Sequence, residues 1–191
     1  NVNMVGGPWS WDPSTGRIVG DPFLQRQNEP SLAVSSRNPC HLLGGANDYR
    51  AVDVPGLPGE GEVGDAWLGV FKSIDCGHSW LSTLLPGYPQ DRSPEGMASP
   101  LKGLHAGADA TVRPGPGGIL YYSGIAFNRG ENDLGKVFVA RFLDLNNKEK
   151  GDPLAYAGAT IVDTGTSGQF LDKPRIALDM PRGGHVCTVN G

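Results

Sequence analysis

Apolar residues along this chain occur in short runs, and turns that contain Gly or Pro separate the runs. From Glu29 the sequence Glu-Pro-Ser-Leu-Ala-Val forms one run, residues 35–39 form a turn, and residues 40–46 form a second apolar run. Sustained apolar spacing of i, i+3, i+4 and i+7, which would indicate helices, is absent from the sequence. The chain has 29 Gly and 16 Pro, and 19% of its residues are charged, which is typical of many short strands joined by turns. The pattern therefore predicts an all-β fold.

The strand-turn-strand pattern that begins at Glu29 recurs twice. Asp109 opens a run that is followed by the turn 113–118 and the strand 119–127, and Asp172 opens a run that is followed by the turn 179–184 and the strand 185–189. The three acids are 80 and 63 positions apart, a period that fits a four-stranded unit with loops. Further strands of these units are expected at residues 66–74, 80–85, 136–145 and 160–163.

One hairpin turn carries a specific spacing. Residues 73–80 read Ser-Ile-Asp-Cys-Gly-His-Ser-Trp and fit S-x-D-x-G-x-x-W, with Ser73, Asp75, Gly77 and Trp80 at the fixed positions. The Asp carboxylate can fold back onto backbone N–H groups of the turn, and the Gly can take the positive φ that the turn needs. This stretch resembles the Asp-box of the sialidase-like, or BNR-repeat, β-propellers of exported bacterial proteins. The resemblance implies a role in the fold rather than in chemistry.

The repeat and the resemblance together predict a β-propeller of four-stranded antiparallel blades. We expect an extended N-terminal arm at 1–28, a first blade at 29–108, a second at 109–171, and the first two strands of a third at 172–191. Propellers close with about four to eight blades, so these two and a half blades are expected to belong to a six- or seven-bladed ring, or to assemble with other copies. A two-sheet β-sandwich is the alternative.

The net charge and the cysteine content limit which binding partners and which cellular compartment we expect for the protein. The net charge of −4 supplies no basic stripe, so a nucleic-acid partner is not expected. No apolar run approaches the length of a membrane span. A disulfide between Cys40 and Cys76 is allowed by their expected places at one sheet edge and would suit a secreted or periplasmic protein whose signal is not in this sequence. Three reduced, buried thiols are the alternative.

A binding or catalytic site is expected where the first strands of the blades begin. The long loops gather on this face of the predicted propeller. The acids Glu29, Asp109 and Asp172 would point into a central funnel there, as candidates for proton transfer. Candidate ligand-binding residues near them are Arg26, Asp48, Arg50, Lys173 and Arg175, with Asp53 close by. Two interpretations stay open: a glycosidase-like or anion-binding site, or acids that brace backbone N–H groups and pair with neighbouring basic residues.

No cofactor is predicted. The four His residues have no metal-site spacing. Acids on or beside one Gly-rich loop could hold a calcium ion, namely Asp48, Asp53, Glu60, Glu62 and Asp65.

The family resemblance implies hydrolysis of a terminal sialic acid by an Asp acid/base and a Tyr nucleophile paired with Glu, with three arginines holding the substrate carboxylate. Arg26 and Arg175 could be two of these arginines, but no third and no Tyr/Glu pair can be assigned. The Arg-Ile-Pro motif of sialidases is also absent, because Arg17 and Ile18 are followed by Val19. The function expected is therefore a sialidase-like carbohydrate-active protein, with a non-catalytic platform that binds glycans or proteins as the alternative.

Overall fold

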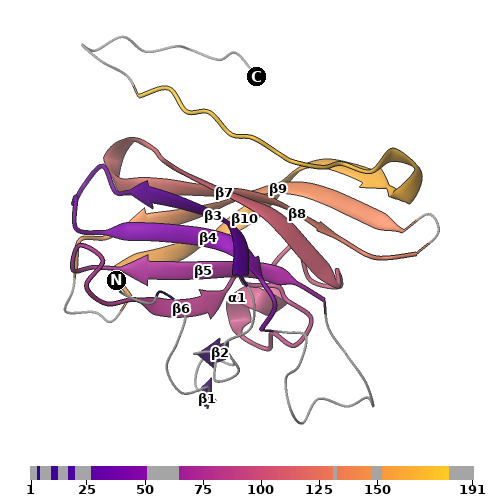
Figure 1. The fold of residues 1–191 in the computed structure, drawn as a ribbon, viewed down its shortest axis with the longest axis horizontal. Coiled ribbons are helices and arrows are strands. Elements are labelled where there is room, and N and C mark those ends of the chain that lie inside the picture. Colours follow the sequence, from indigo (N-terminus) through magenta and orange to yellow (C-terminus); the bar gives the residue numbers. More distant parts are fainter. Residues whose placement is uncertain are drawn as a thin grey trace.

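Two four-stranded antiparallel sheets form the body of the molecule (Figure 1). The computed structural model describes Met4 and residues 10–12, 17–19, 27–50, 65–130, 133–147 and 152–180. In each sheet the strands pair in chain order. The first sheet contains β3 (Gln27–Val34), β4 (Leu42–Asp48), β5 (Trp67–Ser73) and β6 (Leu81–Leu84). The second contains β7 (Ala106–Pro114), β8 (Ile119–Phe127), β9 (Leu134–Asp144) and β10 (Leu154–Thr166).

These eight strands are the strands that the sequence pattern predicts for the first two units, so the all-β prediction is confirmed. The bounds of β8 coincide with the prediction, whereas β10 begins six residues before the expected residue 160. The two sheets are arranged as two adjacent blades would be, and the two-sheet sandwich is also compatible with this arrangement.

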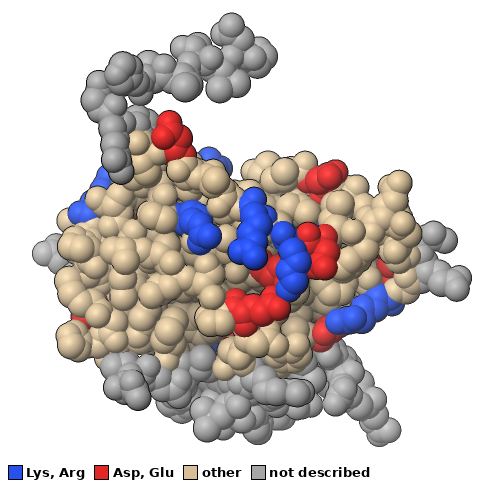
Figure 2. All heavy atoms as spheres, turned by 45° about the horizontal axis from the view of Figure 1, so that its top comes forward, with Lys and Arg blue, Asp and Glu red and all other residues tan. Residues whose placement is uncertain are grey.

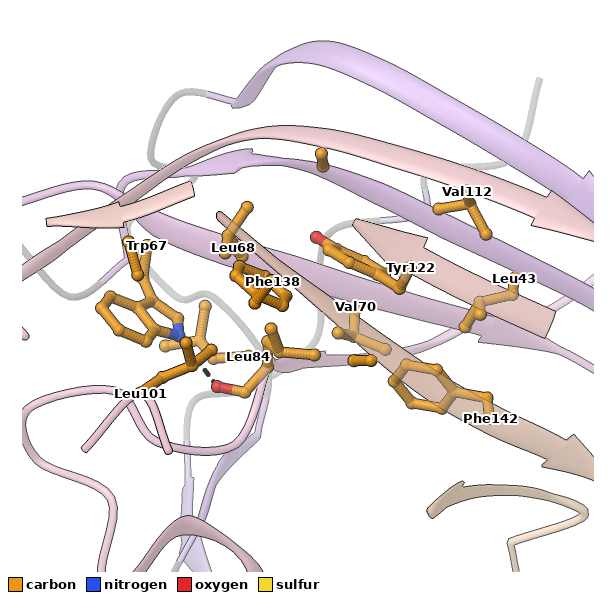
Figure 3. Packing of buried hydrophobic residues seen from close by; sticks show 14 of the residues in the cluster. Leu43, Trp67, Leu68, Val70, Leu84, Leu101, Val112, Tyr122, Phe138 and Phe142 are labelled. Atoms are coloured by element: carbon orange, nitrogen blue, oxygen red, sulfur yellow. Dashed lines mark hydrogen bonds between the residues drawn. The ribbon is translucent and has the colours of Figure 1, made fainter. Parts of the chain in front are cut away.

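The hydrophobic core lies between the two sheets (Figure 3). Leu68 and Val70 of the first sheet pack with Tyr122 and Phe138 of the second, and all four are almost completely buried. The Tyr122 hydroxyl donates a hydrogen bond to the backbone oxygen of Gly69 at 2.9 Å, which ties the sheets together. Burial of this apolar surface is the main force that holds one sheet against the other.

The first strands of the two sheets, β3 and β7, lie side by side. The backbone N–H of Val112 in β7 donates to Ser31 Oγ in β3 at 2.9 Å, and that of Asp109 donates to Asn47 Oδ1 in the neighbouring β4 at 2.8 Å. Both strands have a β-bulge near their start, between Asn28 and Ser31 in β3 and between Ala108 and Thr111 in β7. Their shared geometry agrees with the expected equivalence of the two segments.

The N-terminal arm differs from its prediction. Within the described part of residues 1–28, β1 (Ser10–Asp12) and β2 (Arg17–Val19) form a two-stranded antiparallel sheet, and β3 already begins at Gln27. Strands of three residues are too short to show an alternating pattern, which explains why the sequence did not predict them.

The third unit is not formed in the described residues. Residues 170–180 belong to no strand, although a strand was expected from Asp172 to residue 178. Its expected partner, residues 185–189, lies outside the described part. The third blade therefore stays a prediction.

The structure describes one short α-helix, α1 (Pro94–Met97), in the loop between β6 and β7. Ser93 caps it by accepting a hydrogen bond from the Gly96 N–H at 3.0 Å. Among the described residues, no helix has the length and apolar character needed to cross a membrane.

Candidate functional site

Three chain segments meet at the start of β3 and β7, and each has one residue in an unusual backbone conformation. Glu29, Asp109 and Lys173 have φ values of 53°, 63° and 50°, in the left-handed region that residues other than Gly rarely adopt. Glu29 and Lys173 are each followed by proline, and Asp109 is followed by Ala. The structure thus places Lys173, rather than the predicted Asp172, at the position equivalent to the other two acids. The proline that follows Glu29 and Lys173 was the available signal for this register.

The three side chains form one ionic cluster. The Lys173 ammonium lies 2.8 and 3.0 Å from the two Glu29 carboxylate oxygens and 3.0 Å from Asp109 Oδ1. The Lys173 backbone N–H donates to Asp109 Oδ2 at 3.0 Å, so both oxygens of Asp109 accept hydrogen bonds. Lys173 therefore bridges the starts of β3 and β7, and it fixes the segment after β10 against them.

The cluster favours the charged forms of Asp109 and Lys173. Burial opposes ionisation of Asp109, but hydrogen bonds from the Lys173 side chain and backbone outweigh it, and the pKa of Asp109 is lowered. Hydrogen bonds to Glu29 and Asp109 raise the pKa of Lys173. At neutral pH, Asp109 is therefore a carboxylate and Lys173 an ammonium.

A groove of about 540 Å³ runs between β3, β7 and residues 173–175. Three basic and two acidic side chains line it: Arg113, Lys173 and Arg175 with Glu29 and Asp109. Figure 2 shows a face on which Lys and Arg side chains lie beside Asp and Glu side chains.

Arg113 was not among the predicted site residues. It lies four positions after the predicted Asp109 on β7, and alternation along a strand would place both on one face, which was the signal available for it. Its guanidinium donates to the Val112 backbone oxygen at 2.8 Å. Within the described residues, neither Arg113 nor Arg175 has an ion pair with a carboxylate.

Asp48 and Arg50 occupy a different place from the one expected. Arg50 Nε lies 3.0 and 2.9 Å from the two Asp48 oxygens, and its NH2 group donates to the Thr83 backbone oxygen at 2.8 Å. Both side chains are buried. The structure therefore places this pair among the buried residues at one end of the first sheet and not in the groove, and contact of either residue with a ligand stays a prediction.

The remaining predicted residues are only partly described. Asp172 is exposed and does not line the groove, whereas Arg26 and Asp53 lie outside the described residues. In the described part of the chain, no group of three or more His, Cys, Asp or Glu side chains is placed to hold a metal. Glu60 and Glu62 also lie outside it, so the calcium site stays a prediction. His41 is buried and lies with Nδ1 2.8 Å from Asp144 Oδ1.

The turn at residues 73–80 lies at the far end of the first sheet from the groove, because Gln27 pairs with Asp48 whereas Ser73 pairs with Leu42. Asp75 accepts hydrogen bonds from the Ser79 backbone N–H at 2.9 Å and the Ser79 hydroxyl at 2.6 Å.

These hydrogen bonds lower the pKa of Asp75 to about 2. Gly77 has a φ of 85°, and Trp80 Nε1 donates to the Gly77 oxygen at 3.1 Å. A disulfide joins Cys40 to Cys76 in the same turn. These contacts hold the end of the sheet together.

No family model matches the chain, and no curated protein matches it. Among solved structures, Trypanosoma rangeli sialidase aligns over 83% of this chain and 24% of its own, with 13% identity and a TM-score of 0.45. The same sialidase in complex with the inhibitor DANA aligns over 83% and 23%, with 14% identity and a TM-score of 0.41. The chain spans about a quarter of the length of those sialidase chains.

Proposed function

We propose that the groove along β3 and β7 binds an acidic carbohydrate, and that Arg113 and Arg175 hold its carboxylate. The observation that carries this proposal is that only one of the three basic residues in the groove is paired with its acids. Lys173 is occupied by two carboxylates, which leaves two guanidinium groups without an acidic partner among the described residues. A guanidinium can bind a carboxylate through two parallel hydrogen bonds, so this pair of arginines favours an anionic ligand.

On this proposal the chain contributes two blades to a larger, sialidase-like carbohydrate-active propeller. The two four-stranded sheets and the S-x-D-x-G-x-x-W turn support the assignment. The Cys40–Cys76 disulfide supports an exported protein, because disulfides persist in oxidising compartments. Assembly of further blades, from this polypeptide or from other copies, would close the ring.

Binding is better supported than hydrolysis by the groove alone. Glycoside hydrolases generally need one carboxyl that is protonated near neutral pH and a second that acts as base or nucleophile. Both oxygens of Asp109 accept hydrogen bonds from Lys173, its pKa is lowered, and Glu29 binds the same ammonium. The acids therefore act as the braces of the alternative interpretation. Hydrolysis by the whole protein would need a proton donor from outside the described residues.

The binding proposal is tested with N-acetylneuraminic acid and its methyl ester, which differ in the carboxylate charge. Isothermal titration should show binding of the acid and at least tenfold weaker binding of the ester. R175Q should weaken binding of the acid by roughly tenfold to a hundredfold, because a charged hydrogen bond is worth about 1.5–3 kcal/mol.

R141Q is the matched control, since Arg141 is an exposed arginine on β9 that does not line the groove. Equal binding of acid and ester, or equal effects of R175Q and R141Q, would contradict the proposal.

The hydrolase alternative is tested with a fluorogenic sialoside. We expect no release of fluorophore above the uncatalysed rate. Turnover that disappears in D109N, but persists in R141Q, would overturn the assignment of the acids as braces and would identify the groove as an active site.

A further inference from the structure

The chain segment that follows β10 forms one wall of the groove without belonging to a sheet. Residues 170–180 are in no strand, and each of them is exposed or half-buried. Figure 1 shows this segment leaving the end of β10 and running back along the outside of the sheets. Lys173 and Arg175 of the segment line the groove, whose other walls are β3 and β7. We call residues 170–175 the strap.

Contacts at Phe170 and at Lys173 hold the strap against the sheets. The Phe170 ring meets the Phe127 ring of β8 edge to face, with the centroids 5.4 Å apart. Three residues later, the Lys173 ammonium binds the Glu29 carboxylate at 2.8 and 3.0 Å. Its ammonium and its backbone N–H also donate to the two oxygens of Asp109, each at 3.0 Å. Lys173 is thus the polar anchor that joins the strap to the starts of both sheets.

The docked strap has a backbone conformation that a free chain disfavours. Lys173 has a φ of 50°, and it precedes Pro174, which directs the residue before it to extended conformations. The side chains of Lys173 and Glu29 are 57% and 48% exposed, so dissolved salt screens their contact. Loss of the Lys173 contacts should therefore release the strap while the two packed sheets stay folded.

We infer that Lys173 is a positioning residue, which docks the strap and so brings Arg175 into the groove beside Arg113. Arg113 is held by β7, and its guanidinium donates to the Val112 oxygen at 2.8 Å, whereas Arg175 reaches the groove only while the strap is docked. The apparent affinity for an acidic ligand then scales with the docked fraction of the protein. By linkage, a bound anion stabilises the docked strap. The link to ligand binding rests on the proposed function, whereas docking of the strap by Lys173 does not.

Limited digestion with trypsin tests the docking without a ligand. The bond between Arg175 and Ile176 ends the strap and is a trypsin site, whereas the bond between Lys173 and Pro174 resists trypsin because of the proline. Mass spectrometry would measure cleavage after Arg175, with cleavage after Arg141 in β9 as the indicator of global unfolding. K173Q should speed cleavage after Arg175 roughly tenfold to a hundredfold, because losing a charged hydrogen bond raises the undocked population by about that factor.

Two variants control for the change of charge. K173R keeps a cation that can bind both carboxylates, so it should restore slow cleavage. R141Q removes an exposed charge that does not line the groove, so it should leave cleavage after Arg175 unchanged. Raising the salt concentration from about 0.05 M to about 1 M should speed this cleavage in the unmodified protein but not in K173Q.

Isothermal titration with N-acetylneuraminic acid tests the link to binding. K173Q should weaken binding of the acid at least tenfold, K173R should restore most of the affinity, and R141Q should bind normally. Saturation with the acid should also slow cleavage after Arg175 in the unmodified protein, since the ligand stabilises the docked strap.

The outcomes separate this inference from the proposed function. Equal cleavage after Arg175 in K173Q and the unmodified protein would overturn the inference, whether or not the acid binds. Equal acceleration after Arg141 and Arg175 would indicate global unfolding and would also overturn it, as would faster cleavage in K173Q with unchanged affinity for the acid. If the unmodified protein binds no acid, but K173Q is cleaved faster and K173R is not, the proposed function fails and the docking of the strap by Lys173 stands.

Discussion

The loss of folding stability on neutralising the Asp109 carboxylate is a direct test of the ionic cluster. Asp109 is 9% exposed, and its two oxygens accept hydrogen bonds from the Lys173 backbone N–H and ammonium, each at 3.0 Å. In D109N one of these oxygens becomes an NH2 group that faces a donor, so one charged hydrogen bond is lost. Such a bond contributes about 1.5–3 kcal/mol. We therefore expect D109N to lower the free energy of unfolding by about 2 kcal/mol at pH 7.

The measurement is urea unfolding followed by tryptophan fluorescence, with E29Q as the matched control. Glu29 contacts the same ammonium, but its side chain is 48% exposed, so E29Q should cost less than about 1 kcal/mol. The lowered pKa of Asp109 means that its stabilisation is complete above the ordinary value of 3.8 and is lost as the pH falls through the lower value in the folded protein. Equal costs for D109N and E29Q at pH 7 would refute the cluster as described.

Three further predictions concern the rest of the fold. G45A should lower the free energy of unfolding by about 1–3 kcal/mol, because the new Cβ would lie 2.7 Å from the Tyr122 ring; an unchanged melting temperature would contradict this. R50L should cost about 3–5 kcal/mol in urea unfolding by leaving its buried carboxylate partner unpaired, yet the folded variant should bind N-acetylneuraminic acid normally. An NMR titration should give Asp75 a pKa of about 2, and S79A should raise it, since Ser79 supplies the main hydrogen bonds.

The order of the strands was predictable from the sequence because turns with strong local signals mark the ends of most strands. The strand Ile119–Phe127 follows a turn of Gly and Pro and consists mostly of apolar and aromatic residues, and its bounds were predicted without error. β10 was predicted only in part. Residues 155–159 read Ala-Tyr-Ala-Gly-Ala, which has no alternation of polar and apolar side chains, and a β-bulge interrupts the pairing there. Pairing with β9, a tertiary contact, extends this strand where local pattern does not.

The residues of the candidate site that follow from the repeat could be predicted from the sequence. The residues whose role depends on burial could not. Glu29 and Asp109 were expected at equivalent positions, and the structure brings them to one lysine. The Asp48–Arg50 pair had the same local appearance as a ligand site, a carboxylate and a guanidinium at the end of a strand. Only the packing of β5 and β6 around the pair shows that it is internal.

The left-handed residues explain why the groove forms where it does. Residues before proline are sterically directed to extended conformations, so the positive φ of Glu29 and Lys173 costs energy, on the order of 1–3 kcal/mol at each position. Contacts between segments offset this cost. The bulge N–H of Asp109 is bound by Asn47 from the first sheet, and the N–H of Lys173 is bound by Asp109 from the second. In this conformation the two later segments each dock on the sheet before them, and the three charged side chains come together. The same repeat that builds the sheets thereby assembles the charges of the groove.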